Sequence, residues 1–415
     1  MKILIYSANY APEPTGIGKY SGEMAEWLAQ QGHEVRVVAA PPYYPDWKLA
    51  EGYRWPPYRK ERIQGCTVWR APLWVPRNPG GLKRVLHLAS FSLTSLPLMV
   101  MQWGWKPDVV LTVAPSFMCS PMGWLTARMT GATAWLHVQD FEVEVAFTMG
   151  LLKGGLSRFI VRGLESAMMR RFDAVSTISG RMLDLLKVKG IPAERCRMFP
   201  NWVDIDRIRP LTQVSSYRKQ LGIPDNAVVC LFSGSLGRKQ GLMVIPQAAQ
   251  LLSTRVDIHY VICGDGVMKP ELEKACSDLD RVHLLPLQPV ERLADLLGLA
   301  DIHLLPQSPE AEDLVLPSKL TGMVSSGRAI IATCNPGSEI ASVVSQCGLV
   351  VPPEDAPALA RAIVQLADDA EGRRQMGLSA RRYAEEQIGR DAVLGKLAND
   401  MVAFRERPAP FSAQA

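Results

Sequence analysis

The sequence predicts two doubly wound α/β domains in one chain of 415 residues. Short runs of apolar residues alternate with helical patterns in both halves of the chain. Apolar strands of this kind are typical of a parallel sheet that helices cover on both faces. A glycine-rich turn that begins at Ser233 restarts the pattern in mid-chain. The length suits two domains that each bury a core.

In the first half, the apolar runs predict five strands and the helical patterns predict two helices. The strands are Lys2–Tyr6, Val35–Ala39, Val109–Val113, Thr133–Val138 and Ala174–Ile178, and the helices are Gly18–Gln31 and Gly180–Lys187. A Pro- and Trp-rich insertion from Pro41 to about Pro107 separates the second strand from the third.

The second half repeats the pattern and sets the domain boundaries. Its predicted strands are Val228–Phe232, Asp257–Cys263, Val282–Leu285, Ile302–Leu305, Ala329–Thr333 and Gly348–Val351, with a helix at Leu242–Leu252. We expect a first domain over 1–200 and a second over 201–390. In 391–415 we expect a helix that packs back on the first domain, followed by a loose tail. Such folds bind ligands at the carboxyl ends of their strands, so we expect the two domains to face each other across a cleft.

Composition limits the class of protein. The chain is 47% hydrophobic and 21% charged, and its net charge of +5 is too small to indicate nucleic acid as a partner. The 8 cysteines show no metal-binding spacing and most lie in apolar runs, which predicts buried free thiols in a reducing compartment. The N-terminus reads as a strand without signal-peptide features, and no uninterrupted apolar run is long enough for a membrane span. We therefore expect a cytoplasmic protein.

The turn Ser233–Gly241 predicts an anion site. It follows an apolar run, contains Gly234, and carries Arg238 and Lys239 directly before a helical pattern. Backbone N–H groups at a helix N-terminus and nearby cations attract a phosphate. The alternative is an ordinary turn with solvated cations.

A second glycine turn, Gly16-Ile-Gly18, follows the first predicted strand. It does not match a dinucleotide fingerprint, because Pro12 and Pro14 occupy the tight turn and no acidic residue ends the second strand. We expect a flexible lip whose amides approach a phosphate or sugar; a loop without a ligand is the alternative.

Polar residues gather where the strand Thr133–Val138 ends. His137, Gln139 and Asp140 stand there, and Glu142 and Glu144 follow. A doubly wound fold places its chemistry at such a position. We regard His137 first and Asp140 second as candidate catalytic residues. A hydrogen-bonded histidine and a helix cap at Asp140 would explain the same pattern.

Two short motifs have simpler interpretations. Asp204-Ile-Asp206 resembles a metal-binding pair, but it follows a Pro-Asn-Trp turn, where acids usually form caps or turns. No metal site is therefore expected. Gly264-Asp-Gly266 follows a predicted strand, and we expect it either to shape the wall of the nucleotide site or to form a plain turn.

The insertion suggests contact with a membrane surface. It contains Trp47, Trp55, Trp69, Trp74, Trp103 and Trp105, and the cations Arg77, Lys83 and Arg84 precede the apolar run 85–101. Tryptophans beside cations suit lipid headgroups. A buried helix pair with a proline kink is the alternative.

Several segments together resemble the GT-B glycosyltransferases of family GT4, most closely the colanic-acid-type exopolysaccharide transferases. They are Tyr10-Ala-Pro-Glu-Pro-Thr-Gly-Ile-Gly-Lys19, Gly32-His-Glu-Val-Arg-Val-Val38, Ala39-Ala-Pro-Pro-Tyr-Tyr-Pro45, Trp135-Leu-His-Val-Gln-Asp-Phe-Glu142, Phe199-Pro-Asn-Trp-Val-Asp204, Gly234-Ser-Leu-Gly-Arg-Lys-Gln-Gly-Leu242 and Leu316-Pro-Ser-Lys-Leu320. Their order and spacing cover nearly the whole chain.

The resemblance implies a role for each domain. The second domain would hold a nucleoside-diphosphate sugar through Gly234, Arg238, Lys239, Gly264, Asp313, Ser318 and Lys319, with Gly16 and Gly18 contributing from the first domain. The acceptor would contact Tyr10, Glu13, Tyr43 and Tyr44. In similar enzymes a histidine at position 137, or an adjacent acid, touches the transferred sugar. Lys239 would stabilise the departing diphosphate, and no metal or other cofactor is required.

The chain departs from the family pattern at two places. Ser235 and Gln240 stand where the family has an arginine and a lysine, so Arg238 and Lys239 would replace that pair. Leu314 and Gly322 stand where two glutamates are usual, and Asp313 could serve for the first. Ser318 and Lys319 could bind phosphate at the next helix N-terminus.

The sequence thus predicts a retaining glycosyltransferase of exopolysaccharide assembly. Its partners would be a nucleotide-sugar donor, a polyprenyl-diphosphate-linked saccharide acceptor and the anionic inner face of the cell membrane, with no nucleic acid. Two alternatives remain. A nucleotide-sugar 2-epimerase of the same architecture would need acids poised for proton abstraction. A non-catalytic subunit that binds sugar nucleotides or polysaccharide would not release free sugar from a donor.

Overall fold

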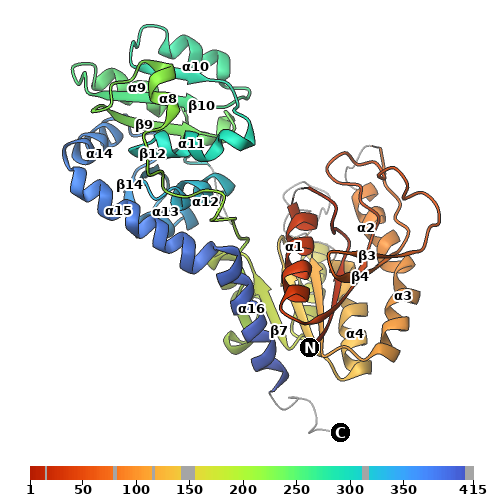
Figure 1. Ribbon diagram of the computed structural model, residues 1–415. Coiled ribbons are helices and arrows are strands. Elements are labelled where there is room, and N and C mark those ends of the chain that lie inside the picture. The colour runs from red at the N-terminus through yellow and green to blue at the C-terminus, as the bar shows by residue number, and fades with distance from the viewer. Residues whose placement is uncertain (15, 78–81, 115–116, 142–154, 311–316, 407–415) are drawn as a thin grey trace. The chain divides into compact units, whose positions relative to one another are not determined.

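The computed structural model describes residues 1–14, 16–77, 82–114, 117–141, 155–310 and 317–406. The chain forms two compact units (Figure 1). Unit 1 comprises Met1–Asn201 and Leu394–Ala415, and unit 2 comprises Trp202–Val393. Each unit is built around its own parallel sheet, which confirms the predicted α/β class.

Unit 1 contains an eight-stranded sheet in the order β3-β4-β2-β1-β5-β6-β7-β8. Its strands are β1 (Lys2–Ser7), β2 (Glu34–Ala39), β3 (Arg59–Ile63), β4 (Cys66–Arg70), β5 (Val109–Ala114), β6 (Thr133–Val138), β7 (Ala174–Thr177) and β8 (Cys196–Met198). Its helices are α1 (Gly16–Gln30), α2 (Leu82–Thr94), α3 (Leu96–Met101), α4 (Ser120–Thr130), α6 (Gly155–Met169) and α7 (Gly180–Val188). All neighbouring strands are parallel except β3 and β4.

The insertion between β2 and β5 contains two strands that the sequence pattern did not predict. β4 pairs in parallel with β2 and buries Val68 and Trp69 in unit 1. β3, of sequence RKERI, then pairs antiparallel with β4 at the edge of the sheet. A charged edge strand has no apolar alternation to reveal it, and charge at an edge opposes pairing with another chain.

The end of the chain packs on unit 1. Helix α16 spans Arg390–Arg405, and its last residues lie beside the sheet of unit 1. The rings of Phe404 and Trp135 meet edge to face with centroids 5.5 Å apart, and Asp400 pairs with Arg197 at 3.3 Å. These contacts hold the last turns of the helix against β6 and β8.

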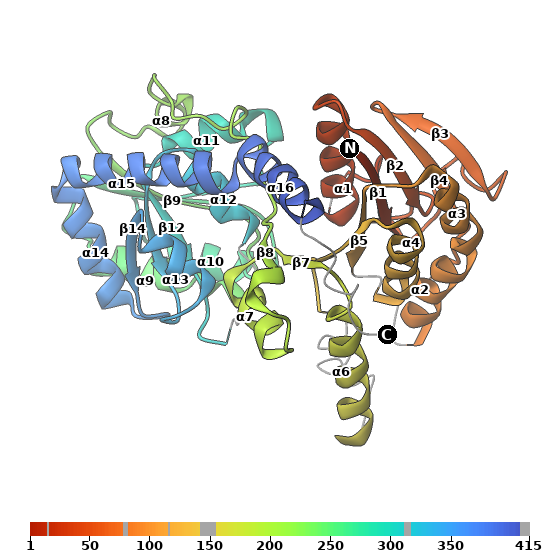
Figure 2. The same ribbon diagram turned by 90° about the horizontal axis from the view of Figure 1, so that it is seen from below.

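Unit 2 contains a six-stranded parallel sheet in the order β11-β10-β9-β12-β13-β14. Its strands are β9 (Val228–Ser233), β10 (Ile258–Cys263), β11 (Val282–Leu285), β12 (Ile302–Pro306), β13 (Ala329–Thr333) and β14 (Gly348–Val351). Its helices are α8 (Ser216–Leu221), α9 (Val244–Leu251), α10 (Lys269–Cys276), α11 (Leu293–Leu299), α12 (Ser318–Ser325), α13 (Glu339–Val344), α14 (Ala356–Asp368) and α15 (Ala370–Tyr383). Figure 2 shows strands β9, β12 and β14 of this sheet with helices on both sides.

Helices cover both faces of this sheet. Cys230 and Phe232 of β9 belong to a cluster with residues of α9 and α14, whereas Val229 and Leu231 belong to a cluster with residues of α8 and α11. Because alternate residues of a strand point to opposite faces, an apolar strand such as VVCLFS requires a cover on each side. Polar side chains begin four helices of unit 2: Ser215, Ser338, Asp355 and Asp369 each accept a hydrogen bond from a backbone N–H of the first turn.

All eight cysteines are free and buried, as the sequence predicted. Among the described residues, one stretch, Lys83–Trp105, has the length and apolar composition of a membrane-crossing helix, although core helices of other proteins pass the same test. In this structure the stretch is divided into α2, α3 and a short 3-10 turn, and a third of its most apolar window is buried.

Candidate functional site

The strand order of unit 2 reverses between β9 and β12. From β9 the chain proceeds outward through β10 and β11, and it then returns to the other side of β9 through β12 and β13. In an open α/β sheet, ligands bind outside the carboxyl ends of the strands at such a switch point. The turn at Ser233–Gly241 follows the carboxyl end of β9, so the predicted anion site stands at this position.

Glycines let the turns after β9 and β10 approach each other closely. A Cβ atom on Gly264 would lie 1.9 Å from the carbonyl oxygen of Gly234, and one on Gly266 would lie 2.6 Å from the carbonyl oxygen of Leu236. The Leu236 N–H donates to the carbonyl oxygen of Asp265 at 2.9 Å, and the Met268 N–H donates back to Leu236 at 3.0 Å. Gly264 and Gly266 therefore have a structural reason to be glycine.

The cations of the β9 turn do not stand at a helix N-terminus, which corrects the sequence-based expectation. Arg238 and Lys239 lie in a 3-10 turn, Arg238–Gln240, and helix α9 begins only at Val244. Both side chains are exposed. The turn is held against β12, because the Ser308 N–H donates to the carbonyl oxygen of Lys239 at 3.0 Å. A Cβ on Gly241 would lie 2.9 Å from the carbonyl carbon of Gln307.

Lys319 joins this group from the first turn of α12. Its Nζ donates a hydrogen bond to Oε1 of Gln240 and lies 5.0 Å from the centroid of the Phe232 ring. The side chain is half-buried. Gln240 and Phe232 thus hold the Lys319 ammonium beside the β9 turn, and both contacts come from residues to which the sequence pattern gave no role.

Two residues predicted to bind the donor are Asp313 and Ser318. Asp313 lies outside the described residues, and Ser318 begins α12 but its side chain is likewise outside the described part of the structure. Glu142 and Glu144, which follow Asp140 in the sequence, also lie outside the described residues.

A cavity of about 310 Å³ opens beside the paired glycine turns. Leu236, Gly264, Pro286 and Lys269 are among its lining residues. It lies at the carboxyl ends of β10 and β11, on the side of β9 away from β12. Its wall is mostly apolar, which suits a flat ring more than a charged group.

In unit 1, the predicted acceptor residues surround Glu13. Its buried carboxylate accepts hydrogen bonds from Asn9 Nδ2 at 2.9 Å and from the N–H groups of Tyr43 and Tyr44, each at 3.2 Å. Burial raises the pKa of Glu13, and these hydrogen bonds oppose that shift. Tyr10 and Tyr43 are also buried, and Tyr44 is 41% exposed. The buried residues Tyr10, Glu13 and Tyr43 support the loop. Tyr44 is the member of the predicted acceptor group that solvent reaches.

The Gly16 to Gly18 turn depends on the same carboxylate. Gly16 has φ of +61°, and a Cβ on Gly18 would lie 2.3 Å from Oε2 of Glu13. Helix α1 begins at Gly16. Glycine at both positions therefore has a backbone reason that does not involve a ligand.

His137 is a buried residue of β6. Its Nδ1 lies 3.0 Å from Oγ of Ser176, and its ring packs on Phe199 with centroids 4.7 Å apart. Burial lowers the pKa of His137 to about 3, so the ring is neutral near pH 7. Asp140, beyond the end of the strand, has an exposed side chain. Although the residue is exposed, the protein atoms around its carboxyl reduce the hydration of that group and raise its pKa, and the charge of Arg84 opposes this shift.

The Asp204–Asp206 motif forms a turn. Oδ1 of Asp204 accepts from the N–H groups of Asp206 and Arg207 at 3.1 and 3.2 Å, and Asp206 pairs with Arg209. This is the turn-forming role that the sequence favoured.

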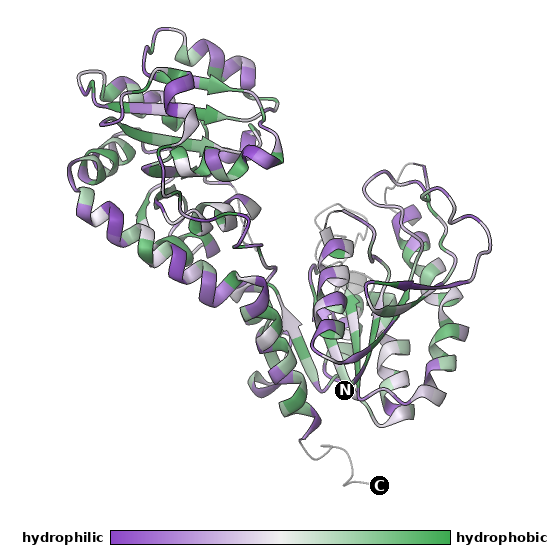
Figure 3. Cartoon of the chain, viewed as in Figure 1, coloured by the Kyte–Doolittle hydropathy of each residue, from purple (hydrophilic) through white to green (hydrophobic). Residues whose placement is uncertain are grey.

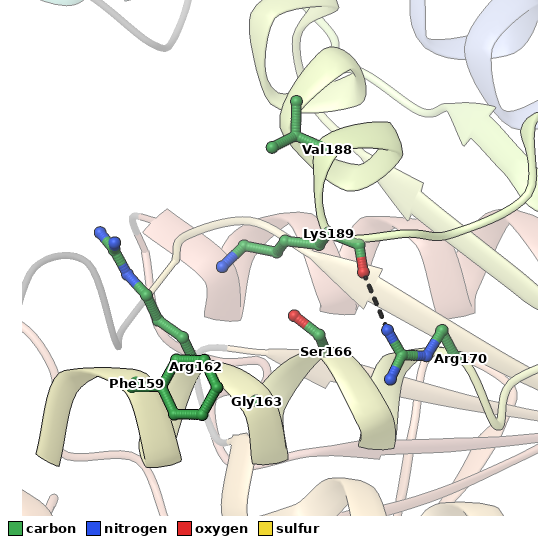
Figure 4. Close-up of a pocket in the computed structure, with 7 residues that line it drawn as sticks. All are labelled: Phe159, Arg162, Gly163, Ser166, Arg170, Val188 and Lys189. Carbon is green, nitrogen blue, oxygen red and sulfur yellow. Dashed lines mark hydrogen bonds between the residues drawn. The ribbon is translucent and has the colours of Figure 1, made fainter. Parts of the chain in front are cut away.

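A separate cavity of about 520 Å³ lies between α6 and the end of α7 in unit 1 (Figure 4). Arg162, Arg170 and Lys189 are among its lining residues. Lys189 is paired with the buried Glu165 at 2.5 Å, and Arg170 donates to the carbonyl oxygen of Lys189. None of the predicted site residues lines this cavity.

Each unit has its own α/β sheet, and the comparisons with known proteins identify the family of the chain. Residues 15–202 match the model of the "Glycosyl transferase 4-like domain", and residues 227–369 match the "Glycosyl transferases group 1" model. The chain is 40% identical to a colanic acid biosynthesis glycosyl transferase, WcaI, of Escherichia coli K12, whose name marks that role as provisional; the match covers 97% of this chain and 100% of the relative. This protein belongs to the GT4-type, group 1 glycosyltransferases.

More distant proteins agree with this assignment. The D-inositol 3-phosphate glycosyltransferase of Streptomyces avermitilis is 30% identical over 64% of this chain and 59% of its own length. The structure of Anabaena HepE with UDP and glucose superposes with a TM-score of 0.61 at 17% identity, covering 97% of this chain and 100% of HepE. Sucrose-phosphate synthase of Thermosynechococcus elongatus gives 0.64 at 18% identity, with the same coverage of both chains. These neighbours support the GT-B fold.

Proposed function

We propose that this protein is a retaining glycosyltransferase that takes its sugar from a nucleoside-diphosphate donor bound to unit 2. The observation that carries the proposal is the cluster of exposed or half-buried cations, Arg238, Lys239 and Lys319, at the β9/β12 switch point. A diphosphate needs several cationic or N–H donors, and this edge of the sheet offers both.

The family usually has a lysine at the position of Gln240, and Lys319 would supply the charge of that lysine here. Since Gln240 donates no charge but accepts a hydrogen bond from Lys319, the positive charge is supplied from α12 and held at the β9 turn. The Phe232 ring favours an ammonium above its face. The diphosphate would lie between this ammonium and the exposed Arg238 and Lys239. The mostly apolar cavity beside Gly264 would take the base.

The reaction would use the donor's own leaving group as the base. The bond between the anomeric carbon and the diphosphate oxygen breaks, and the acceptor hydroxyl oxygen bonds to the same face of that carbon. The acceptor's proton passes to the departing diphosphate, whose charge Lys239 and Lys319 stabilise. No protein nucleophile and no metal are required. His137 and Asp140 would approach the transferred sugar from unit 1, His137 as a neutral imidazole.

The relative from E. coli suggests the pathway. Its name assigns it to colanic acid biosynthesis, and we propose that this protein likewise extends an exopolysaccharide. The acceptor would be a saccharide on a polyprenyl diphosphate, which remains at the inner face of the cell membrane while the glycan enters the enzyme.

An apolar surface of unit 1 suits this location. Exposed apolar side chains lie on α2, α3 and the neighbouring α4 with the 3-10 turn before it. They are Val85, Leu86, Leu93, Leu96, Val100, Met101, Met118, Leu125 and Met129. Figure 3 colours much of α2 and α3 as hydrophobic. From Arg77 to Pro107 the chain has four cations and no acidic residue. We define these side chains, with Lys83 and Arg84, as the α2–α4 face, and propose that it lies on an anionic membrane.

Part of the tryptophan prediction needs correction. Trp69 and Trp105 are buried, and the guanidinium of Arg36 stacks on both rings. They therefore stabilise unit 1 and do not reach lipid. Trp74 and Trp55 are exposed.

Donor turnover tests the proposed activity. A thermal-shift panel of UDP-, GDP- and dTDP-sugars identifies the nucleotide that stabilises the protein, and release of free sugar from that donor without acceptor then distinguishes a transferase from a non-catalytic binding subunit. A protein that no nucleotide sugar stabilises would contradict the proposal.

Liposome flotation tests the membrane contact separately. The protein should float with anionic vesicles at low salt, less at high salt, and less as the Lys83→Glu/Arg84→Glu variant, because each cation adds about 1 kcal/mol of attraction. Arg62→Glu/Lys274→Glu makes the same charge change on exposed residues elsewhere and should float like wild type. If the protein does not float at low salt, a soluble acceptor is the better hypothesis.

A further inference from the structure

A cavity of about 270 Å³ in unit 2 is lined by four arginines. They are Arg328, directly before β13, and Arg373, Arg374 and Arg381 of α15. Asp301, just before β12, is the acidic residue among its lining residues. The cavity therefore lies at the amino ends of β12 and β13, whereas the β9 turn and Lys319 follow carboxyl ends. The length of the sheet separates it from the donor site.

Three of the five charged residues that line the cavity are neutralised by ion pairs. Arg374 pairs with Glu371 at 2.6 Å, Arg381 pairs with Glu385 at 2.7 Å, and Asp301 pairs with Arg218 at 2.7 Å. The two charged residues of the lining that remain are Arg328 and Arg373.

Arg328 and Arg373 form no ion pair with a carboxylate in the part of the chain that the structure describes. Arg328 donates from Nη2 to the carbonyl oxygen of Gly298 at 3.1 Å, and its buried Nε has no hydrogen-bond partner among the described residues. Arg373 donates from Nη1 to the carbonyl oxygens of Leu366 and Ala367. A carbonyl satisfies a donor but does not neutralise a charge, and each guanidinium has five N–H donors.

The uncompensated charge acts on its surroundings. The pKa of the buried His303 is lowered to about 3, mainly by burial and further by the charge of Arg328. Both arginines are half-buried, so solvent screens their charges less than it would at the surface. Two such guanidinium groups beside one cavity favour a multivalent anion.

We propose that this cavity binds a phosphoryl group, either free or as part of a small metabolite, through Arg328 and Arg373. A planar guanidinium presents parallel N–H groups that match two oxygens of a phosphate. The volume is many times the roughly 10–15 Å³ that one water needs, so a phosphate or pyrophosphate fits. Close packing of backbone shapes the wall: a Cβ on Gly377 of α15 would lie 2.3 Å from the carbonyl oxygen of Gly327. This site is independent of the proposed reaction.

Calorimetry on the full chain tests the site. Inorganic phosphate and pyrophosphate are titrated at constant ionic strength, with sodium chloride as the reference salt, and the two titrations show which source of the phosphoryl group is preferred. Arg373→Gln and Arg328→Gln should each weaken binding at least tenfold, the loss expected for a charge-assisted bidentate contact. Arg382→Gln, on the same helix but outside the cavity, should bind like wild type.

Further variants separate this site from the donor site and from a folding defect. Lys319→Ala should leave phosphate binding unchanged; if it abolishes binding, the anion occupies the donor site and the proposal is wrong. Arg373→Lys keeps the charge without the planar fork and should retain weakened binding, which a folding defect would not produce. The proposal is wrong if wild type, Arg328→Gln and Arg373→Gln bind phosphate with equal affinity. It is also wrong if phosphate and pyrophosphate release no more heat than sodium chloride does.

Discussion

The two units use the same architecture but present different edges to a ligand. At the carboxyl ends of β9 and β10, unit 2 has Gly234, Gly264 and Gly266, and cations stand on the exposed side. At the carboxyl ends of β1 and β6, unit 1 has the buried side chains of Tyr10, Glu13 and His137.

This difference indicates what each edge can bind. Glycine turns and exposed cations, as in unit 2, suit a charged diphosphate, the group that all nucleoside-diphosphate sugars have in common. The buried side chains of unit 1 shape its loop from within. Tyr44, the exposed residue of the proposed acceptor group, is the one that suits contact with a saccharide. If the two units have separate roles, a substitution in one unit should leave the function of the other unit unchanged.

The largest effect is expected from unit 1. His137→Ala should abolish sugar transfer but retain nucleotide affinity in calorimetry, because His137 belongs to unit 1 and the proposed nucleotide site to unit 2. Gln139→Ala, at the same strand end, is the matched control and should remain active. If nucleotide affinity collapses together with transfer, the division of roles between the units is wrong.

The cations of unit 2 should show the next largest effect. Lys239→Ala and Lys319→Ala should each lower turnover about a hundredfold, the usual loss when one stabiliser of transition-state charge is removed. Lys274→Ala removes an exposed lysine of α10 and should leave turnover unchanged. Activity like that of wild type in Lys239→Ala would remove this lysine from the site.

The close approach of the turns in unit 2 predicts a loss of stability. Gly264→Ala should lower the free energy of unfolding by about 1–3 kcal/mol, because its Cβ would overlap the Gly234 carbonyl oxygen. Gly395→Ala, in helix α16, meets nothing within 4 Å and should be neutral or slightly stabilising. Urea unfolding measures both. Unchanged stability of Gly264→Ala would mean that the turns can separate without cost.

Buried histidines should make both units less stable in acid. The pKa values of His137 and His303 are lowered to about 3, so between pH 6.5 and 3 the unfolded chain binds protons that the folded chain does not. Stability is full above pH 6.5 and falls as the pH decreases, by about 2 kcal/mol for each histidine at pH 5.

Substituted proteins assign this acid sensitivity to each unit. His137→Asn reports on unit 1 and His303→Asn on unit 2, and each should show a smaller loss between pH 7.5 and pH 5 than wild type. The slope with pH is the measurement, since either substitution can also change stability at neutral pH. An unchanged slope in both variants would mean that other groups cause the acid loss.

The smallest effect is expected from metal removal. EDTA should leave transfer largely intact, and Asp204→Asn should be tolerated in catalysis because Asp204 forms a turn. Activity that disappears with EDTA and returns with manganese would favour a metal-dependent reaction.

Much of the fold could be predicted because its strands are apolar and short. Thr133–Val138, Val282–Leu285, Ala329–Thr333 and Gly348–Val351 have the predicted bounds, and the turns after them contain glycine or polar residues. β3, β4 and β8 were missed. β3 is charged and β8 has three residues, so neither carries a pattern that differs from a loop, and the five residues of β4 lie inside the Pro- and Trp-rich insertion.

Less of the site could be predicted. The glycine turn at Ser233–Gly241 was found, but the helix expected directly after Lys239 begins at Val244. The contact between Gln240 and Lys319 joins residues 79 positions apart and arises only because β9 and β12 are neighbours in the sheet. Tyr10, Glu13 and Tyr43 were recognised as a group, but their burial could not be read from the motif.

The sequence by itself determined the class of fold, the two-unit organisation of its pattern and the places where strands end in glycine. Local hydrophobic periodicity and glycine content are sufficient for these, since each depends on residues close together in the chain. The tertiary structure alone decided which cations remain uncovered, because neutralisation depends on partners that the fold brings from far away. It pairs Arg218 with Asp301, 83 positions away, and leaves Arg328 and Arg373 without a carboxylate among the described residues, although all three arginines look alike in the sequence.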